Sequence, residues 1–240
     1  MRFLSAAVAI TTLGLSTVRA QDTSSSEPSC EQDTGGLPRS EFSKIVFARV
    51  SIRTLCALSR DSVVRRATGA HDAFSLLGSV YQDVLWRTSD EDLVAFFAAF
   101  GESLSFVDAA TCATMYPHSG GAPWAQTFMS VATAIDSAMA VRWTRFIEAW
   151  VWARVKDAPL LPSASRAEVY SYAQRQLRTI TPGERADMIK LARGETLPPQ
   201  RACHVVRLSF ARLAAGHPAQ AGPVIRTLMS GLVPWFSADT

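Results

Sequence analysis

Apolar residues recur at helical spacing along most of the chain. Between residues 93 and 107 they fall every three or four positions, as they do on the buried face of an amphipathic helix. Similar spacing continues in the segments from residue 38 onward, and no stretch alternates apolar and polar residues as a half-buried strand would. The pattern therefore predicts an all-α fold, a multi-helix bundle of about eight helices.

Polar residues that favour helix ends separate these apolar segments. Two pairs have the Ser/Thr-x-x-Glu spacing of a capping box, Ser165 with Glu168 and Thr181 with Glu184. Pro182 occupies the first position after Thr181, where proline is favoured, and Gly194 suits the C-terminal cap of the same helix. These signals predict helix starts close to residues 166 and 182.

The longest predicted helix extends from Trp124 to Asp157. Charged residues at 136, 142, 145 and 148 interrupt its hydrophobic run, so we do not expect it to span a membrane. The preceding loop, His118–Pro123, is the clearest break in the helical pattern and the candidate boundary between two subdomains. The glycines at 120 and 121 either form a permissive turn, which we favour, or present N–H groups to an anion at the helix start.

Two faces of this long helix differ in character. Its large apolar side chains share one face and are predicted to lie in the core: Trp143, Phe146, Ile147 and Trp150. Basic and indole side chains lie largely off that face: Arg142, Arg145, Trp152 and Lys156. Exposed Trp and Arg side chains are typical of protein interfaces. This second set, the basic edge, is therefore the candidate binding surface, and burial in the core stays open as the alternative for Trp152 and its arginines.

The first twenty residues have the organisation of a signal peptide. Arg2 gives a positive start, residues 3–15 are uncharged, and the small side chains of Val18 and Ala20 precede a cleavage point. The uncharged run is too short for a membrane span, which needs about 20 apolar residues. We therefore expect a signal peptide at 1–20, a flexible segment at 21–37 and a helical domain at 38–240, with no membrane span after cleavage. The Arg-rich, Lys-poor composition adds the expectation of a bacterial protein that is periplasmic or secreted.

Four cysteines remain after such a cleavage: Cys30, Cys56, Cys112 and Cys203. An even number in an exported chain favours two disulfides over four free thiols. Three pairings are open, of which we prefer Cys56 with Cys112 and Cys30 with Cys203. The spacings contain no CxxC or CxxH motif, so we expect no zinc site.

Charge and histidine content limit the kinds of ligand. Cleavage would remove Arg2 and Arg19, which leaves 22 Lys+Arg against 21 Asp+Glu. A near-neutral chain lacks the clustered basic face that nucleic-acid binding needs. The histidines, His71, His118, His204 and His217, form no metal-binding pair at helical spacing. We therefore expect no metal, no cofactor and no nucleic acid.

One segment resembles a known enzyme family. Glu102 and Ser103 lie in the sequence FGESLSF, with Phe106 four positions after Glu102. This dipeptide resembles that of helical, lysozyme-like lytic transglycosylases, which implies a general-acid role for Glu102 and a raised pKa. The resemblance covers these few residues, and the downstream Gly-Leu-Met-Gln type stretch has no counterpart before Pro123. Helical geometry places Glu102 about 200° from Phe100, which favours a solvated side chain.

Three classes of function follow from these observations. The one we favour is an exported, non-enzymatic helical protein that binds another protein, as an accessory subunit, chaperone or inhibitor, or that forms a homodimer. It predicts an exposed apolar patch. The second is a cell-wall-acting enzyme using Glu102, which predicts a cleft around that residue. The third is a carrier of an apolar ligand, which predicts a closed cavity of roughly a few hundred Å³.

Overall fold

The protein is all-α throughout the part of the chain that the structure describes. The structure is a computed structural model of the 240-residue chain that describes residues 41, 44–81, 83–115 and 121–230. Twelve α-helices and a 3₁₀ turn lie in these ranges: α3 (Val46–Arg60), α4 (Ser62–Thr68), α5 (Ala73–Tyr81), α6 (Val84–Arg87), α7 (Asp90–Ser103), η2 (Leu104–Phe106), α8 (Ala109–Ala113), α9 (Gly121–Ala134), α10 (Ser137–Val155), α11 (Arg166–Leu177), α12 (Pro182–Ala192), α13 (Pro199–Ala214) and α14 (Pro218–Met229).

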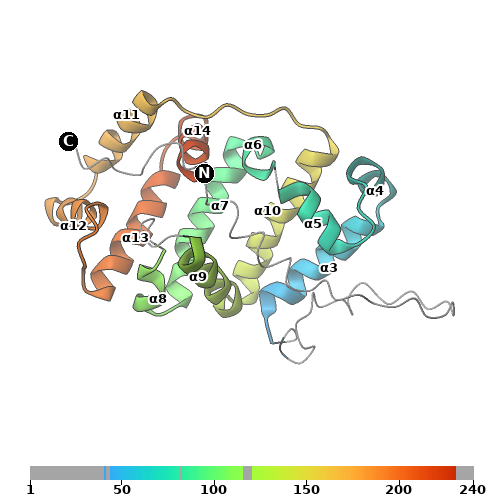
Figure 1. Ribbon diagram of the computed structural model, residues 1–240, viewed down its shortest axis with the longest axis horizontal. Coiled ribbons are helices and arrows are strands. Elements are labelled where there is room, and N and C mark those ends of the chain that lie inside the picture. Colours follow the sequence, from blue (N-terminus) through green and yellow to red (C-terminus); the bar gives the residue numbers. More distant parts are fainter. Residues whose placement is uncertain (1–40, 42–43, 82, 116–120, 231–240) are drawn as a thin grey trace.

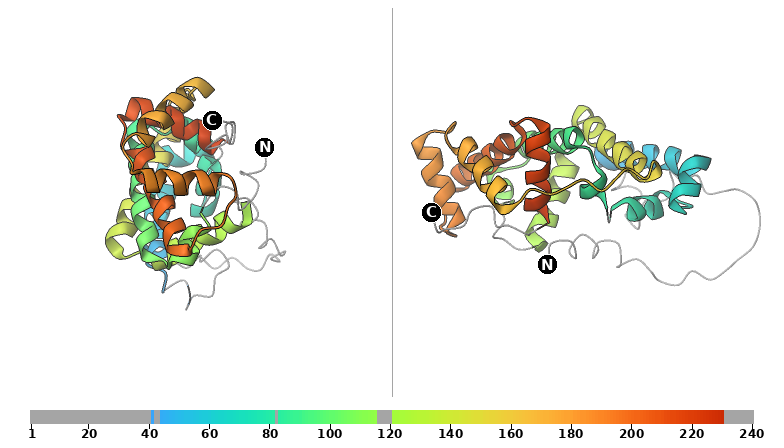
Figure 2. Two further views of the ribbon diagram at one scale, coloured as in Figure 1. Left: turned by 90° about the vertical axis from the view of Figure 1, so that its left-hand side faces the viewer. Right: turned by 90° about the horizontal axis from the view of Figure 1, so that it is seen from above.

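The helices form an elongated molecule around two central helices, α7 and α10 (Figure 1). Helices α3, α4 and α5 lie at one end, and α11 and α12 lie at the other. The view from above shows the same separation of the two ends (Figure 2). The connection from α10 to α11 runs along one side of the molecule and joins the two ends.

Two clusters of buried apolar side chains hold this arrangement together. The larger cluster involves α7, α8, α9 and α11 to α14, and the smaller one lies among α3, α4 and α5. Helix α10 contributes to both, with Trp143 and Phe146 in the larger cluster and Ile147 and Val151 in the smaller one. Residues on both sides of positions 116–120 share the larger cluster, so the described cores do not divide at the loop 118–123.

The prediction of about eight helices is lower than the twelve that the structure describes, in part because two predicted helices are interrupted. The segment expected as one helix from Trp124 to Asp157 is divided into α9 and α10. Asp136 lies between them in an extended conformation, and its Oδ1 accepts a hydrogen bond from the backbone N–H of Met139 at 2.8 Å. Asp136 is therefore the N-cap of α10, and the predicted long helix breaks at this residue. The segment 72–87, whose apolar spacing also predicts a single helix, is likewise divided into α5 and α6.

The local capping signals are confirmed. Ser165 with Glu168 and Thr181 with Glu184 both form complete capping boxes, at the starts of α11 and α12. Pro182 is the first residue of α12. Gly194, just past its end, has a φ of 77°, a left-handed conformation that glycine adopts without steric cost.

The preferred cysteine pairing is wrong. Cys112 forms a disulfide with Cys203, which is 91 residues away in the sequence, and thereby links α8 to α13. Cys112 is fully buried between these helices, and their contact brings together two segments that no local sequence pattern relates. Cys56 lies buried in α3 and is not a free thiol. Cys30 lies outside the described residues.

A buried arginine connects α14 to the middle of the molecule. Arg226 of α14 has no exposed surface. Its guanidinium donates to the Leu85 and Thr88 carbonyl oxygens at 2.8 and 2.6 Å, and to Asp90 Oδ1 at 2.6 Å. Gly222, one turn earlier in α14, allows the approach of Asp90, because a Cβ there would overlap with the Asp90 carboxylate. These contacts tie α14 to the segment between α6 and α7.

Several expectations concern residues outside this description. They are the signal peptide at 1–20, the flexible segment at 21–37 and the side chain of His118. Among the helices that the structure does describe, none combines the length and the apolar character that crossing a bilayer requires.

Candidate functional site

Glu102 lies at the exposed end of α7 in an ion pair. Arg142 of α10 donates to both carboxylate oxygens of Glu102, at 2.5 and 3.3 Å. More than half of the Glu102 side chain is exposed, at 55 %. The hydrogen bond from Arg142 is the largest cause that lowers the pKa of Glu102. A general acid needs the opposite, an apolar surrounding that raises the pKa and keeps the proton in place.

The neighbouring Ser103 has a structural contact that accounts for its presence. Its side chain is fully buried, donates to the Ala99 carbonyl oxygen, and accepts a hydrogen bond from Trp143 Nε1 at 3.0 Å. Trp143 in turn stacks on the ring of Phe100, with 5.6 Å between ring centroids. Ser103 therefore supplies the polar partner that a buried indole N–H requires.

The basic edge of α10 is only partly a continuous surface. Arg145 and Lys156 are exposed, whereas Arg142 is engaged by Glu102 and the ring of Trp152 packs against the smaller core cluster. Trp152 thus takes a position between core and surface. All four stay predicted binding residues, of which Arg145 and Lys156 are the exposed cations.

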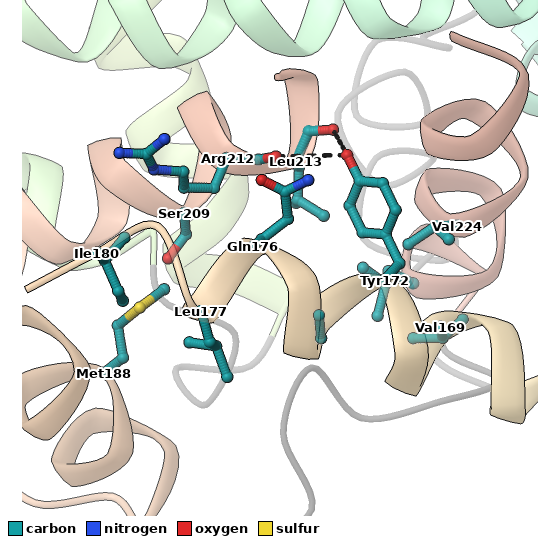
Figure 3. A pocket seen from close by; sticks show the side chains of 12 residues that line it. Val169, Tyr172, Gln176, Leu177, Ile180, Met188, Ser209, Arg212, Leu213 and Val224 are labelled. Carbon is teal, nitrogen blue, oxygen red and sulfur yellow. Dashed lines mark hydrogen bonds between the residues drawn. The ribbon is translucent and has the colours of Figure 1, made fainter. Parts of the chain in front are cut away.

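The described part of the chain has a groove at the end of the molecule where α11 and α12 lie. It is formed between α11, α12, α13 and α14 (Figure 3). Side chains from α11 and α13 form its two long walls. Val224 of α14 closes one end, and Ile180 with Met188 closes the other. The remaining lining residues are Val169, Tyr172, Ala173, Gln176, Leu177, Ser209, Arg212, Leu213 and Leu228. We call this site the α11–α14 groove.

The walls of the groove are fixed by buried hydrogen bonds. Tyr172 is 2 % exposed, and its hydroxyl donates to the Leu213 carbonyl oxygen at 2.7 Å (Figure 3). Burial raises the pKa of Tyr172, so this hydroxyl keeps its proton. Ser209 donates to the Val205 carbonyl oxygen at 2.8 Å within α13. Both hydroxyls are thus engaged by backbone carbonyl oxygens, and the surface of the groove is mainly apolar.

The size of the groove limits what it can hold. Its volume is about 40 Å³, and it is open to solvent on one side. Since one water needs roughly 10–15 Å³ by such a measure, this space admits the branched end of an aliphatic side chain. A drug-sized ligand needs roughly 300 Å³ or more, so the closed cavity expected of a carrier is not found among the described residues.

Arginine side chains surround the groove. Arg212 lines it, and its Nη2 donates to the Thr179 carbonyl oxygen at 3.4 Å. Arg185 donates to the Leu177 carbonyl oxygen at 2.8 Å, and the Arg175 guanidinium lies 5.8 Å from the centre of the Tyr172 ring. The Arg212 Nε–H is buried and has no hydrogen-bond partner within the described ranges.

Most carboxylates in these helices are already engaged. Glu184 accepts from the Thr181 backbone N–H and from His204 Nε2, and these contacts, with His204 first, lower its pKa to about 2. Asp187 forms a two-pronged ion pair with Arg201, and Glu168 caps α11. The acidic side chains therefore leave the arginines at the groove unneutralised.

No metal centre is found in the described ranges. His71, His204 and His217 lie there, and no group of three His, Cys, Asp or Glu side chains comes close enough to hold a metal ion. The sequence pattern pointed to α10 and to Glu102, and it missed the groove. The one signal for the groove was local: ten Lys+Arg against four Asp+Glu fall between residues 158 and 230.

Comparison with known proteins gives no relative from which a site could be transferred. No family model, no curated protein and no solved structure matches this chain.

Proposed function

We propose that this chain is an exported, non-enzymatic helical protein that acts by binding another protein, and that the α11–α14 groove receives an apolar side chain of that partner. The observation that carries the proposal is the groove itself. It is apolar, open on one side, bounded by four helices, and of the size of a single side chain. Pockets of this kind typically anchor the few residues that dominate the affinity of a protein interface.

The two alternatives have less support. A carrier of an apolar ligand needs an enclosed volume several times larger than about 40 Å³. A transglycosylase-like enzyme needs Glu102 as a proton donor, and the Arg142 contact favours its ionised form. Both alternatives remain weaker proposals, because each lacks the geometry that its chemistry would use.

Export and a second disulfide belong to the same proposal. The Cys112–Cys203 disulfide supports folding in an oxidising compartment, such as the periplasm or the extracellular medium. With those two cysteines paired, Cys30 is the remaining cysteine for Cys56. Mass spectrometry of the protein purified from its own cells tests both points. We expect a mature chain that begins at Gln21 and a peptide pair joined through Cys30 and Cys56.

The binding proposal is tested by photocrosslinking in intact cells. A photoreactive phenylalanine analogue replaces Gln176, which is partly exposed at the groove. The matched control replaces Lys190 of α12, which is exposed and does not line the groove. We expect one discrete protein adduct from position 176 and none from position 190.

A groove-filling variant connects the adduct to the groove. Ala173→Leu places a branched side chain among the lining residues, and it should abolish the adduct from position 176 while leaving the melting temperature close to that of the parent. An adduct that forms equally from both positions, or one that survives Ala173→Leu, would count against the groove as the binding site. The adduct's mass identifies a second copy of the chain if the partner is a homodimer subunit.

A further inference from the structure

We infer that the partner segment bound by the α11–α14 groove is acidic: an aliphatic side chain flanked by Asp or Glu residues. This inference rests on the proposed function and names the chemistry of its partner. The acidic character of the partner is inferred from the charged residues around the groove, since the lining of the groove is apolar.

The first step is the uneven distribution of charge along the chain. Residues 158–230 carry ten Lys+Arg against four Asp+Glu, whereas residues 41–157 carry eleven against twelve. Arg226 is buried and paired with Asp90, so nine cations against four carboxylates remain for the surface of the helices that form the groove and of their connections. Whole-chain neutrality hides this difference, and a positive surface of this kind attracts and orients an oppositely charged partner.

The second step is the position of that charge. Three guanidinium groups lie beside the groove. Arg185 donates to the Leu177 carbonyl oxygen and Arg212 is a lining residue. Arg175 lies near the Tyr172 ring and donates to Ser171 Oγ and Gln220 Oε1, two residues outside the lining. None of the three forms an ion pair with a carboxylate within the described part of the chain. Their positive charge is thus fixed in place and uncompensated.

The third step is the number of donors that remain. A guanidinium has five N–H donors in a planar fork that matches a carboxylate. Arg185 and Arg212 each use one donor on a backbone carbonyl. The other Nη donors of these two side chains make no hydrogen bond within the described part of the chain. A carboxylate beside the groove would supply acceptors for them.

The apolar lining and the uncompensated arginines together select one class of occupant. A purely apolar segment would fill the groove and leave the cations without counter-charges. A basic segment would be repelled by them, and a free carboxylate would leave the apolar lining exposed. An aliphatic side chain with acidic neighbours satisfies both the groove and its surrounding arginines.

The test measures the affinity of the full mature protein for short, fluorescently labelled peptides with a central leucine. The leucine is flanked by Glu in one peptide, by Gln in the second and by Lys in the third. We expect the Glu peptide to bind about tenfold more tightly than the Gln peptide, from two partly exposed ion pairs. The Lys peptide should bind most weakly. Raising the ionic strength from about 0.05 to 0.5 M should remove most of this difference.

Matched variants locate the effect. Arg212→Gln and Arg185→Gln should each reduce the preference for the Glu peptide about threefold. Arg207→Gln should leave it unchanged, because Arg207 is exposed on α13 without lining the groove. Ala173→Leu should reduce the binding of all the peptides by filling the apolar space.

The outcomes separate this inference from the proposed function. The Glu and Gln peptides could bind equally well, and both could lose binding in Ala173→Leu. That result overturns the inference of an acidic partner and leaves the groove as a binding site. Absence of binding by any peptide overturns both. Binding that persists in Ala173→Leu shows attraction to surface charge alone and overturns the inference. Stronger binding of all peptides after removal of residues 231–240 identifies that segment as the occupant and also overturns it.

Discussion

The Arg226 side chain is a buried cation whose donors are used by one carboxylate and by backbone carbonyls from two other segments. Besides Asp90, Leu85 and Thr88, its Nη1 lies 3.4 Å from the Pro162 carbonyl oxygen. Removing one member of a buried ion pair leaves the other without its counter-charge. This loss destabilises the folded protein more than replacing both members does. The residue therefore fixes the relative position of α14, the start of α7 and the α10–α11 connection.

Replacement of this arginine tests that role. Arg226→Met keeps much of the aliphatic volume but removes the donors, so the free energy of unfolding should fall by about 3–5 kcal/mol. Chemical denaturation measures it, and Arg207→Met on the exposed surface of α13 should change it by less than about 0.5 kcal/mol. Similar losses in the two variants would contradict a special role for Arg226.

Glu184 links stability to pH. Its pKa is lowered to about 2, first by the His204 hydrogen bond and then by Thr181, so the folded state favours the ionised form. Its contribution to stability is present above the ordinary glutamate pKa of 4.5 and is lost as the pH falls toward about 2. We expect the melting temperature of the parent to fall more steeply over this range than that of Glu184→Gln.

A second capping box provides the control for this pH dependence. Glu168 also has a lowered pKa, caused by Ser165 alone, and it has no histidine contact. Glu168→Gln should therefore change the acid dependence of the melting temperature less than Glu184→Gln does. Identical acid profiles for the two variants would show that the His204 contact contributes nothing.

At this scale, sequence reasoning succeeded where the signal is local. A capping box needs residues only three positions apart, so Ser165 with Glu168 and Thr181 with Glu184 could be identified from the chain alone. The environment of Arg226 depends on residues more than 130 positions away. No spacing rule relates such residues, and the buried arginine was therefore not predicted.

Among the helices, the break between α9 and α10 was the main feature that the pattern missed. A carboxylate within an apolar run can be an exposed residue inside one helix or the N-cap of a second helix. The local sequence around it is the same in both cases. The extended backbone of Asp136 and its bond to the Met139 N–H identify the second case. The choice depends on how α9 and α10 pack, which the local sequence does not specify.

Asp136→Ala distinguishes these two roles by stability. Loss of an N-cap should lower the free energy of unfolding by about 1 kcal/mol. The control, Glu148→Ala, lies in the exposed middle of α10 and should change it by less than about 0.5 kcal/mol. Urea denaturation measures both free energies. An Asp136→Ala variant as stable as the parent would contradict the N-cap role of Asp136.

The α11–α14 groove is also a property of several elements together. Each of its helices has an ordinary amphipathic pattern, and the unfilled space arises where four of them meet. The sequence could therefore reveal the apolar faces but not the gap between them. The clustering of arginine between residues 158 and 230 was visible, but the charge of the whole chain conceals it.

In the whole molecule, the Cys112–Cys203 disulfide joins the α8 region to the helices that carry the groove. Closing a loop of 91 residues restricts the unfolded chain, and the chain-entropy model gives a stabilisation of about 4–5 kcal/mol. Cys112→Ser with Cys203→Ser should lower the free energy of unfolding by up to that amount in chemical denaturation. An unchanged stability would mean that this disulfide does not constrain the unfolded state.

The all-α class could be predicted because helical spacing is repeated along the chain. The cysteine pairing could not, since it depends on which helices meet, and the contact of α8 with α13 was not visible in the sequence. The candidate site was missed for the same reason: its lining comes from positions 169 to 228, and the most distinctive local pattern belonged to α10.

The central claim is that the α11–α14 groove receives an apolar side chain, and methyl NMR tests it most directly. Ile180 and Met188 lie at one end of the groove, whereas Ile189, adjacent to Met188 on α12, is 43 % exposed and does not line it. On titration with the leucine peptide flanked by Glu, the Ile180 and Met188 methyl signals should shift and the Ile189 signal should stay in place. Unchanged Ile180 and Met188 signals, or an equal shift at Ile189, would contradict the claim.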